Sequence, residues 1–175
     1  MTRPPDILLT TLNAKYIHPS LGLRYLLANM GDLKPQTAIR EFTIARKPRE
    51  VVDELLATLD GQAPVSERNS CGPRIIGFGV YIWNVCQTIS AIHLLKTARP
   101  DILVILSGPE VSYESDEQEI IRLADHVIIG WGDLITLDGV SKAYELRHHH
   151  AKASYPHQPA PLNPPATQND FQSSL

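Results

Sequence analysis

The sequence predicts a doubly wound α/β domain, a parallel β-sheet with helices on both faces. Two features lead to this class. Short apolar runs of strand length alternate with longer segments of helical period, and the alternation repeats five times. Hydrophobic residues make up 43% of the 175-residue chain, which is sufficient for the buried core of one domain.

The first repeat opens with an uninterrupted apolar run. Residues 7–12 are apolar towards both faces, which is typical of a strand between two layers of helices. A polar loop over residues 13–19 follows, and a helix is expected from about Ser20, with Gly31 as its stop. Its apolar stripe consists of Leu23, Leu26, Leu27 and Met30.

The second strand carries charge. Residues 37–44 are rich in β-formers but contain Arg40 and Glu41, which an edge strand tolerates and which discourage stray pairing. Pro48 suits the first turn of the next helix, and Gly61 ends it. The apolar face of this helix comprises Val51, Val52, Leu55, Leu56 and Leu59.

The third repeat follows a surface loop over residues 62–73. Its strand covers residues 74–80, and Asn84 is expected to cap the next helix, with Gln87 completing a capping-box-like pair. Pro100 marks the end of that helix.

The last two repeats complete the sheet. Residues 102–106 are the most apolar strand and are expected at its centre, and Ser115 with Gln118 suggests the capped start of a short helix. Residues 126–129 form the fifth strand, and Asp133 is expected to cap a last helix. The apolar positions of that helix are Leu134, Leu137, Val140 and Tyr144.

Right-handed crossovers and an edge position for the second strand favour the strand order 2-1-3-4-5 of flavodoxin-like sheets. Residues 1–147 then form one α/β domain. Residues 148–175 are rich in Pro, Gln, Ser and Ala with almost no apolar period, and are expected to be a disordered tail.

Composition excludes several classes. The net charge of −3 and the lack of a basic stripe among aromatics argue against a nucleic-acid partner. The apolar runs fall short of the ~18 residues of a membrane span, and no signal-peptide core is present, so the chain is expected in the cytoplasm. Cys71 and Cys86 suit neither a zinc site nor a disulfide framework, and Cys86 is expected to pack inside a helix.

The binding site is expected at the carboxyl ends of the parallel strands, where four loops converge. These loops and the strand ends beside them supply the candidate site residues. The candidates are Asn13, Tyr16, His18, Gly79, Tyr81, Trp83, Asn84, Ser107, Gly108, Pro109, Glu110, Gly130 and Gly132.

Each candidate type has two interpretations. Gly108 and Gly79 lack a Cβ, so a flat ligand could approach the backbone there, although a simple turn or tight helix packing also explains them. Tyr81 and Trp83 could line an apolar pocket, cap the core or face a partner domain. His18 could be a metal ligand or an acid–base group, although a single loop histidine is more often neither. Glu110 could accept hydrogen bonds from ligand amides or simply open a helix.

The usual phosphate-binding motifs are absent. The turn after the first strand contains neither GxGxxG nor GxxxxGK[ST], and the ends of the first and third strands carry Asn13 and Tyr81 rather than acidic residues. A large, mainly apolar ligand or a protein surface remains.

Three ordered strings, at residues 11–26, 77–84 and 107–113, carry a family resemblance. Over residues 6–133 the chain resembles the N-terminal domain of cobalamin-dependent radical S-adenosylmethionine proteins. The resemblance implies a Rossmann-like fold that holds cobalamin at its carboxyl edge, between this domain and a following radical barrel.

The chain departs from that family in three places. The first loop has His18 but no DxHxxG motif, so the resemblance implies cobalamin held without a protein ligand to cobalt. Gly130-Trp131-Gly132-Asp133 stands where the family usually has Gly-Glu-Gly-Glu. The CxxxCxxC motif is absent, and two cysteines cannot supply three thiolates, so no [4Fe–4S] cluster is expected on this chain.

The chain is therefore expected to be a truncated or split member, not catalytically competent alone. The first hypothesis is a cobalamin-binding module that acts with a radical S-adenosylmethionine domain or subunit. The second is a ligand-free interaction or vestigial domain that self-associates through the surface around Trp83 and Trp131. A free-standing flavodoxin-like enzyme that binds FMN is the third.

Overall fold

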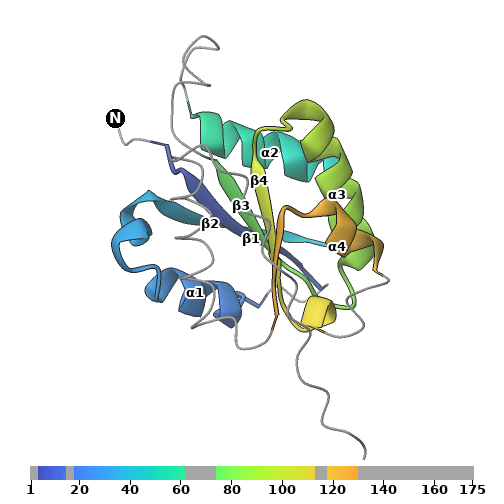
Figure 1. Ribbon diagram of the computed structural model, residues 1–175, viewed down its shortest axis with the longest axis horizontal. Coiled ribbons are helices and arrows are strands. Elements are labelled where there is room, and N and C mark those ends of the chain that lie inside the picture. The colour runs from blue at the N-terminus through green and yellow to red at the C-terminus, as the bar shows by residue number, and fades with distance from the viewer. Residues whose placement is uncertain (1–3, 15–17, 62–73, 113–117, 130–175) are drawn as a thin grey trace, which may run out of the picture.

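A parallel β-sheet forms the centre of the protein in the computed structural model, which describes residues 4–14, 18–61, 74–112 and 118–129 (Figure 1). Within these ranges the sheet has five strands in the order β2-β1-β3-β4-β5. All neighbouring strands are parallel, so the predicted order 2-1-3-4-5 is confirmed. The strands are β1 (Ile7–Asn13), β2 (Thr37–Thr43), β3 (Ile75–Gly79), β4 (Leu103–Ser107) and β5 (His126–Ile128).

Helices pack against both faces of the sheet, as a doubly wound fold requires. Buried side chains of α2, α3 and α4 share one core cluster with Leu8, Phe78 and Leu106, whereas Leu23 of α1 belongs to a second cluster with Ile7 and Leu9. The α-helices are α1 (Leu21–Ala28), α2 (Pro48–Asp60), α3 (Val85–Ala98) and α4 (Glu119–Leu123), and two 3₁₀ segments cover Gly31–Gln36 and Glu110–Ser112. None of the helices in these ranges is long and apolar enough to cross a membrane.

Strand β1 explains why the sheet is a single buried layer. Its alternate residues Leu8 and Leu12 enter one cluster, and Ile7 and Leu9 enter the other. The strand is therefore buried on both faces, as its continuous apolar run predicts. Strand β2 pairs on one side only, which confirms its edge position and places Arg40 in solvent.

The start of α1 agrees with the sequence, whereas its end does not. Ser20 caps the helix by accepting a hydrogen bond from the Leu23 backbone N–H. The helix ends at Ala28 rather than at Gly31, and Gly31, with φ 49°, opens the 3₁₀ segment. Gly61, with φ 56°, terminates α2 as expected.

Two other expectations concern the helices. Cys86 lies in α3, but its side chain is exposed rather than packed. The short helix α4 has Gln118 at its N-cap position without a side-chain cap bond, while Ser115 lies outside the described residues, as do the expected last helix and the tail over 148–175.

A buried ion pair closes the amino ends of β1 and β3. Arg74 is 3% exposed, and its Nη1 lies 3.7 Å from the carboxylate of Asp6, which is 1% exposed. The same nitrogen donates to the carbonyls of Pro5 at 2.7 Å and Leu59 at 2.6 Å. One guanidinium thus joins the start of β1, the end of α2 and the start of β3 at the edge opposite the expected site.

Replacing Arg74 with Ala should lower the free energy of unfolding by about 3–5 kcal/mol, because the variant removes the buried cation that lies beside Asp6 and donates to the Pro5 and Leu59 carbonyls. Urea denaturation at neutral pH measures the change. Arg49→Ala is the matched control, since Arg49 pairs with Asp53 in solvent and should cost less than about 0.5 kcal/mol. Equal losses in the two variants would contradict a structural role for the buried pair.

Candidate functional site

The described candidate residues gather at the carboxyl edge of the sheet. The register aligns Gly79 with Thr11 on one side and with Ser107 on the other, so β3 and β4 end at one level and β1 continues to Asn13. The loops after these strands bring together Asn13, Tyr81, Trp83, Asn84, Ser107, Gly108, Pro109 and Glu110. Tyr16, Gly130 and Gly132 lie outside the described residues.

Asn84 does not cap α3 as the sequence suggests. It occupies the N-cap position, but its fully buried side chain makes no cap hydrogen bond and points back to the sheet. The two hydrogens on its Nδ2 are shared among three acceptors: Thr11 Oγ1 at 3.2 Å, the Leu12 carbonyl at 3.1 Å and the Gly79 carbonyl at 3.2 Å. Its Oδ1 accepts from the Tyr81 backbone N–H at 2.9 Å. The amide therefore ties the ends of β1 and β3 to the loop that follows.

Tyr81 and Trp83 form a stacked aromatic pair over the end of β1. Their ring centroids are 4.7 Å apart and their planes differ by 5°. The indole Nε1 donates to the Leu12 carbonyl at 3.3 Å, which anchors Trp83 while 45% of the residue remains exposed. The pair thus presents aromatic surface at the predicted edge rather than filling the core.

The aromatic pair continues into the first turn of α1. The Tyr81 hydroxyl lies 3.6 Å from the position that a Cβ on Gly22 would occupy. Large apolar side chains are exposed on either side of this contact, and we call them the apolar shelf: Leu21, Tyr25, Ile82 and Trp83. Exposed apolar side chains that neighbour one contact make this surface a candidate for binding, because single scattered ones are normal.

Gly108 packs tightly against the loop that follows β3. A Cβ at this residue would lie 2.3 Å from the Val80 carbonyl oxygen and 2.9 Å from the Val80 nitrogen. Its φ of 125° is also a conformation that side chains avoid. The backbone of the neighbouring loop therefore fills the space that a side chain at this position would need, so tight packing of the two loops requires a glycine here.

Gly79 differs from Gly108. A Cβ there would make ordinary contacts of 3.5 Å or more, with Thr11 and with Leu23 of α1. Helix packing, the second interpretation of this glycine, agrees with the contact to Leu23.

Gly108→Ala should destabilise the fold by more than about 2 kcal/mol, because it adds both backbone strain and a clash with Val80. Gly79→Ala should change stability by less than about 1 kcal/mol, since its Cβ fits at van der Waals distance. Urea denaturation of the two variants measures the difference. A stable Gly108→Ala protein would overturn the close packing of these loops.

The loop after β4 is held by backbone contacts. Ser107 is half-buried, and its carbonyl accepts from the Val80 N–H at 2.7 Å. Glu110 opens a 3₁₀ turn, and its carbonyl accepts from Gln118 Nε2 at 3.1 Å, which agrees with its interpretation as a helix-entry residue. Pro109 is exposed, and its carbonyl accepts from the Ser112 N–H at 3.2 Å.

Glu41 organises the loop after β1, a role that the sequence analysis missed. Its Oε1 accepts from the Ser20 backbone N–H at 2.5 Å and from Asn13 Nδ2 at 3.4 Å. Its Oε2 accepts from Arg24 at 3.0 Å. His18 lies in this loop and is exposed. The sequence did show a carboxylate near the carboxyl end of an edge strand. That position is explained equally well by protection of the edge against pairing with another chain.

Two opposing effects set the pKa of Glu41. Burial raises the pKa, but hydrogen bonds from the Ser20 backbone, Arg24 and Asn13 outweigh it, so the pKa lies below its ordinary value. The carboxylate therefore stabilises the fold above the pKa of the unfolded chain, and this contribution is lost as the pH falls through the lower folded pKa.

Glu41→Gln should reduce stability at neutral pH by on the order of 1 kcal/mol, since a neutral amide accepts these hydrogen bonds less strongly. The variant should also lose less stability than the wild type between pH 5 and pH 3, because its side chain does not titrate. Urea midpoints across this range measure both effects, with Glu50→Gln as the surface control. Parallel pH profiles for wild type and Glu41→Gln would contradict the prediction.

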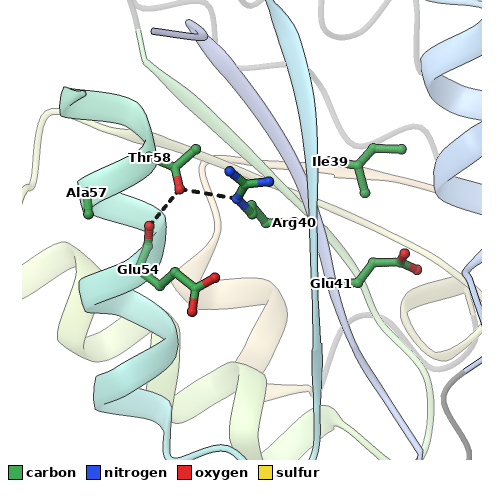
Figure 2. Close-up of a pocket in the computed structure, with 6 residues that line it drawn as sticks. All are labelled: Ile39, Arg40, Glu41, Glu54, Ala57 and Thr58. Atoms are coloured by element: carbon green, nitrogen blue, oxygen red, sulfur yellow. Dashed lines mark hydrogen bonds between the residues drawn. The ribbon is translucent and has the colours of Figure 1, made fainter. Parts of the chain in front are cut away.

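A hollow of about 630 Å³ lies beside β2 and α2 (Figure 2). Its lining residues are Ile39, Arg40, Glu41, Glu54, Ala57 and Thr58. Arg40 Nε donates to Thr58 Oγ1 at 3.3 Å, and that hydroxyl donates to the Glu54 carbonyl (Figure 2). None of the candidate residues and none of the shelf residues lines this hollow, although Glu41 lines it and also bonds to Asn13.

The carboxyl edge suits a broad, mainly apolar ligand that lies across it. The apolar shelf supplies the contact surface, and the adjoining strand ends supply the Asn13 amide and the Ser107 hydroxyl. No group of three or more His, Cys, Asp or Glu side chains that could hold a metal ion occurs within the residues that the structure describes.

Comparison with known proteins gives one family. A family model described as the B12 binding domain matches residues 7–137. No significant match was found among curated proteins.

Proposed function

Because this chain belongs to the family of B12-binding domains, we propose that it binds cobalamin across the carboxyl edge of its sheet. The family model covers every strand and helix described here. The bound cofactor would supply a cobalt centre that can carry an alkyl group or change its oxidation state. The chain itself would bind and orient the corrin ring.

The observation that carries the proposal is the apolar shelf at the end of the sheet. The corrin is a broad ring with apolar faces and amide side chains around its rim. Trp83 and Ile82 expose apolar surface beside the end of β1, and Leu21 and Tyr25 extend it along α1. The Asn13 amide and Ser107 hydroxyl are the polar groups available to ligand amides.

We propose that the protein supplies no ligand to cobalt. His18 is exposed on the loop before α1, but the loop sequence lacks the DxHxxG pattern associated with histidine ligation. Replacing His18 with Ala should therefore leave the visible spectrum of bound cobalamin unchanged.

A radical S-adenosylmethionine domain or subunit is the proposed partner. The three sequence strings at residues 11–26, 77–84 and 107–113 support this assignment, and the exposed shelf gives a partner domain a surface to cover the ligand. With two cysteines, the chain cannot supply the three thiolates of a CxxxCxxC motif, so the partner would provide the [4Fe–4S] cluster and the reaction.

A reducing, cytoplasmic location belongs to the same proposal. Cys86 is a free thiol on the surface of α3, and exposed free thiols are uncommon in proteins of oxidising compartments.

A ligand-free domain that associates with itself is the second candidate. The apolar shelf favours it as well, since two copies could bury the same exposed side chains against each other. Gel filtration with and without cobalamin separates the two functions, because a ligand on the shelf should reduce self-association.

Incubation with hydroxocobalamin followed by gel filtration should leave the corrinoid spectrum with the protein. Trp83→Ala should weaken cobalamin binding about tenfold or more, because it removes the largest apolar contact of the shelf. His93→Ala is the control, since His93 is exposed on α3 and contacts Glu119 away from the shelf. Absence of retained corrinoid at micromolar protein would reject cobalamin binding, and retained FMN instead would favour a flavodoxin-like function.

A further inference from the structure

We infer that Asn84 and Thr11 are positioning residues: their buried hydrogen bonds fix the stacked Tyr81–Trp83 pair as a preformed platform for the ligand. The inference rests on the proposed function for the identity of the ligand, but not for the geometry of the platform. We call these two side chains, with their partners, the Asn84 clasp.

The hydrogen bonds of the Asn84 clasp have a fixed direction. The Thr11 hydroxyl donates to the Gly79 carbonyl at 2.8 Å, so it offers only lone pairs to Asn84. The Asn84 Nδ2 atom donates to this hydroxyl and to two carbonyl oxygens, while Oδ1 accepts from the Tyr81 N–H. An amide in this single orientation therefore satisfies both kinds of partner.

Few other side chains could take this position. An aspartate would set a second negatively polarised oxygen against Thr11 Oγ1, Leu12 O and Gly79 O. A leucine would leave the Tyr81 N–H and the strand-end carbonyls without their side-chain partner. Because the side chain is fully buried, water cannot replace these partners without opening the loop.

The clasp acts directly on the aromatic pair. Tyr81 is held through its backbone N–H by Asn84, and Trp83 is held through its indole by the Leu12 carbonyl, the same oxygen that accepts from Asn84. These hydrogen bonds thus fix the positions of Tyr81 and Trp83 relative to the end of β1. A platform ordered before binding loses less conformational entropy when a ligand arrives.

Asn84→Asp tests the clasp, because its outcome depends on protonation. At neutral pH the carboxylate should repel the surrounding oxygens, displace the loop and abolish the near-ultraviolet circular dichroism of the aromatic pair, defined as the signal that Trp83→Ala removes. Cobalamin affinity should fall about tenfold or more. At lower pH the protonated carboxyl regains one O–H donor and should recover both signals, whereas the wild type should show no such recovery.

In the described part of the chain, the groups that hydrogen-bond to the Asn84 side chain are uncharged: the Thr11 hydroxyl, the Leu12 and Gly79 carbonyls and the Tyr81 backbone N–H. An acid-dependent recovery in Asn84→Asp would therefore report the introduced carboxyl. A second pair of variants covers the case in which Asn84→Asp does not fold. Thr11→Val removes the hydroxyl and should weaken the aromatic signal and binding, whereas Thr11→Ser keeps the hydroxyl and should preserve both.

Leu59→Ala is the control for general loss of stability. Leu59 is fully buried, and its carbonyl accepts from Arg74 at the opposite edge of the sheet. This variant should lower stability while keeping the aromatic signal, with cobalamin affinity within about twofold of wild type. Wild-type signal and affinity in Asn84→Asp at neutral pH, or an equal loss of affinity in Leu59→Ala, would overturn the inference. A wild-type protein that binds no cobalamin would reject the proposed function, while loss and acid recovery of the aromatic signal would still support the clasp.

Discussion

The buried amide of Asn84 is the point on which the carboxyl edge of this protein depends. The carbonyl groups at the ends of parallel strands lack a partner in the next strand. The loop after β3 must therefore leave the sheet in a way that still gives these carbonyls hydrogen-bond donors. Asn84 satisfies the Leu12 and Gly79 carbonyls, while its own oxygen takes the Tyr81 N–H. The aromatic pair follows from this arrangement, because the same hydrogen bonds decide where the loop carries Tyr81 and Trp83.

The two edges of the sheet use different chemistry. The amino edge is joined by charge: Asp6 with Arg74, Asp60 with Arg99, and Lys96 with Asp125. Between β1, β3 and β4 the carboxyl edge relies on neutral hydrogen bonds, and Glu41 forms an ion pair with Arg24 beside the loop after β1. A neutral, partly apolar edge is compatible with a large uncharged ring system, whereas the charged edge serves to hold the layers together.

The order of helices and strands could be predicted from the sequence, because each of these elements is marked by residues that are close together along the chain. The apolar run of β1, the charged edge strand β2 and the glycine after α2 were all readable without contacts. The capping role expected for Asn84 was wrong, and the packing of Gly108 on Val80 could not be predicted, because the partners of both residues are distant along the chain. Glu41 was missed for the same reason, since its hydrogen bond to Ser20 joins residues 21 positions apart.

The close packing of Gly108 on Val80 joins the loop after β3 to the loop after β4. The Val80 N–H donates to the Ser107 carbonyl, and the Val80 carbonyl accepts from the Glu110 N–H. Both backbone groups of Val80 therefore bond to the segment at the end of β4. Moving either segment would therefore break these two hydrogen bonds or move the other segment with it. We therefore expect a molecule that binds at Pro109 to shift the loop that carries the aromatic rings, and a molecule that binds to the rings to shift the short 3₁₀ turn beyond β4.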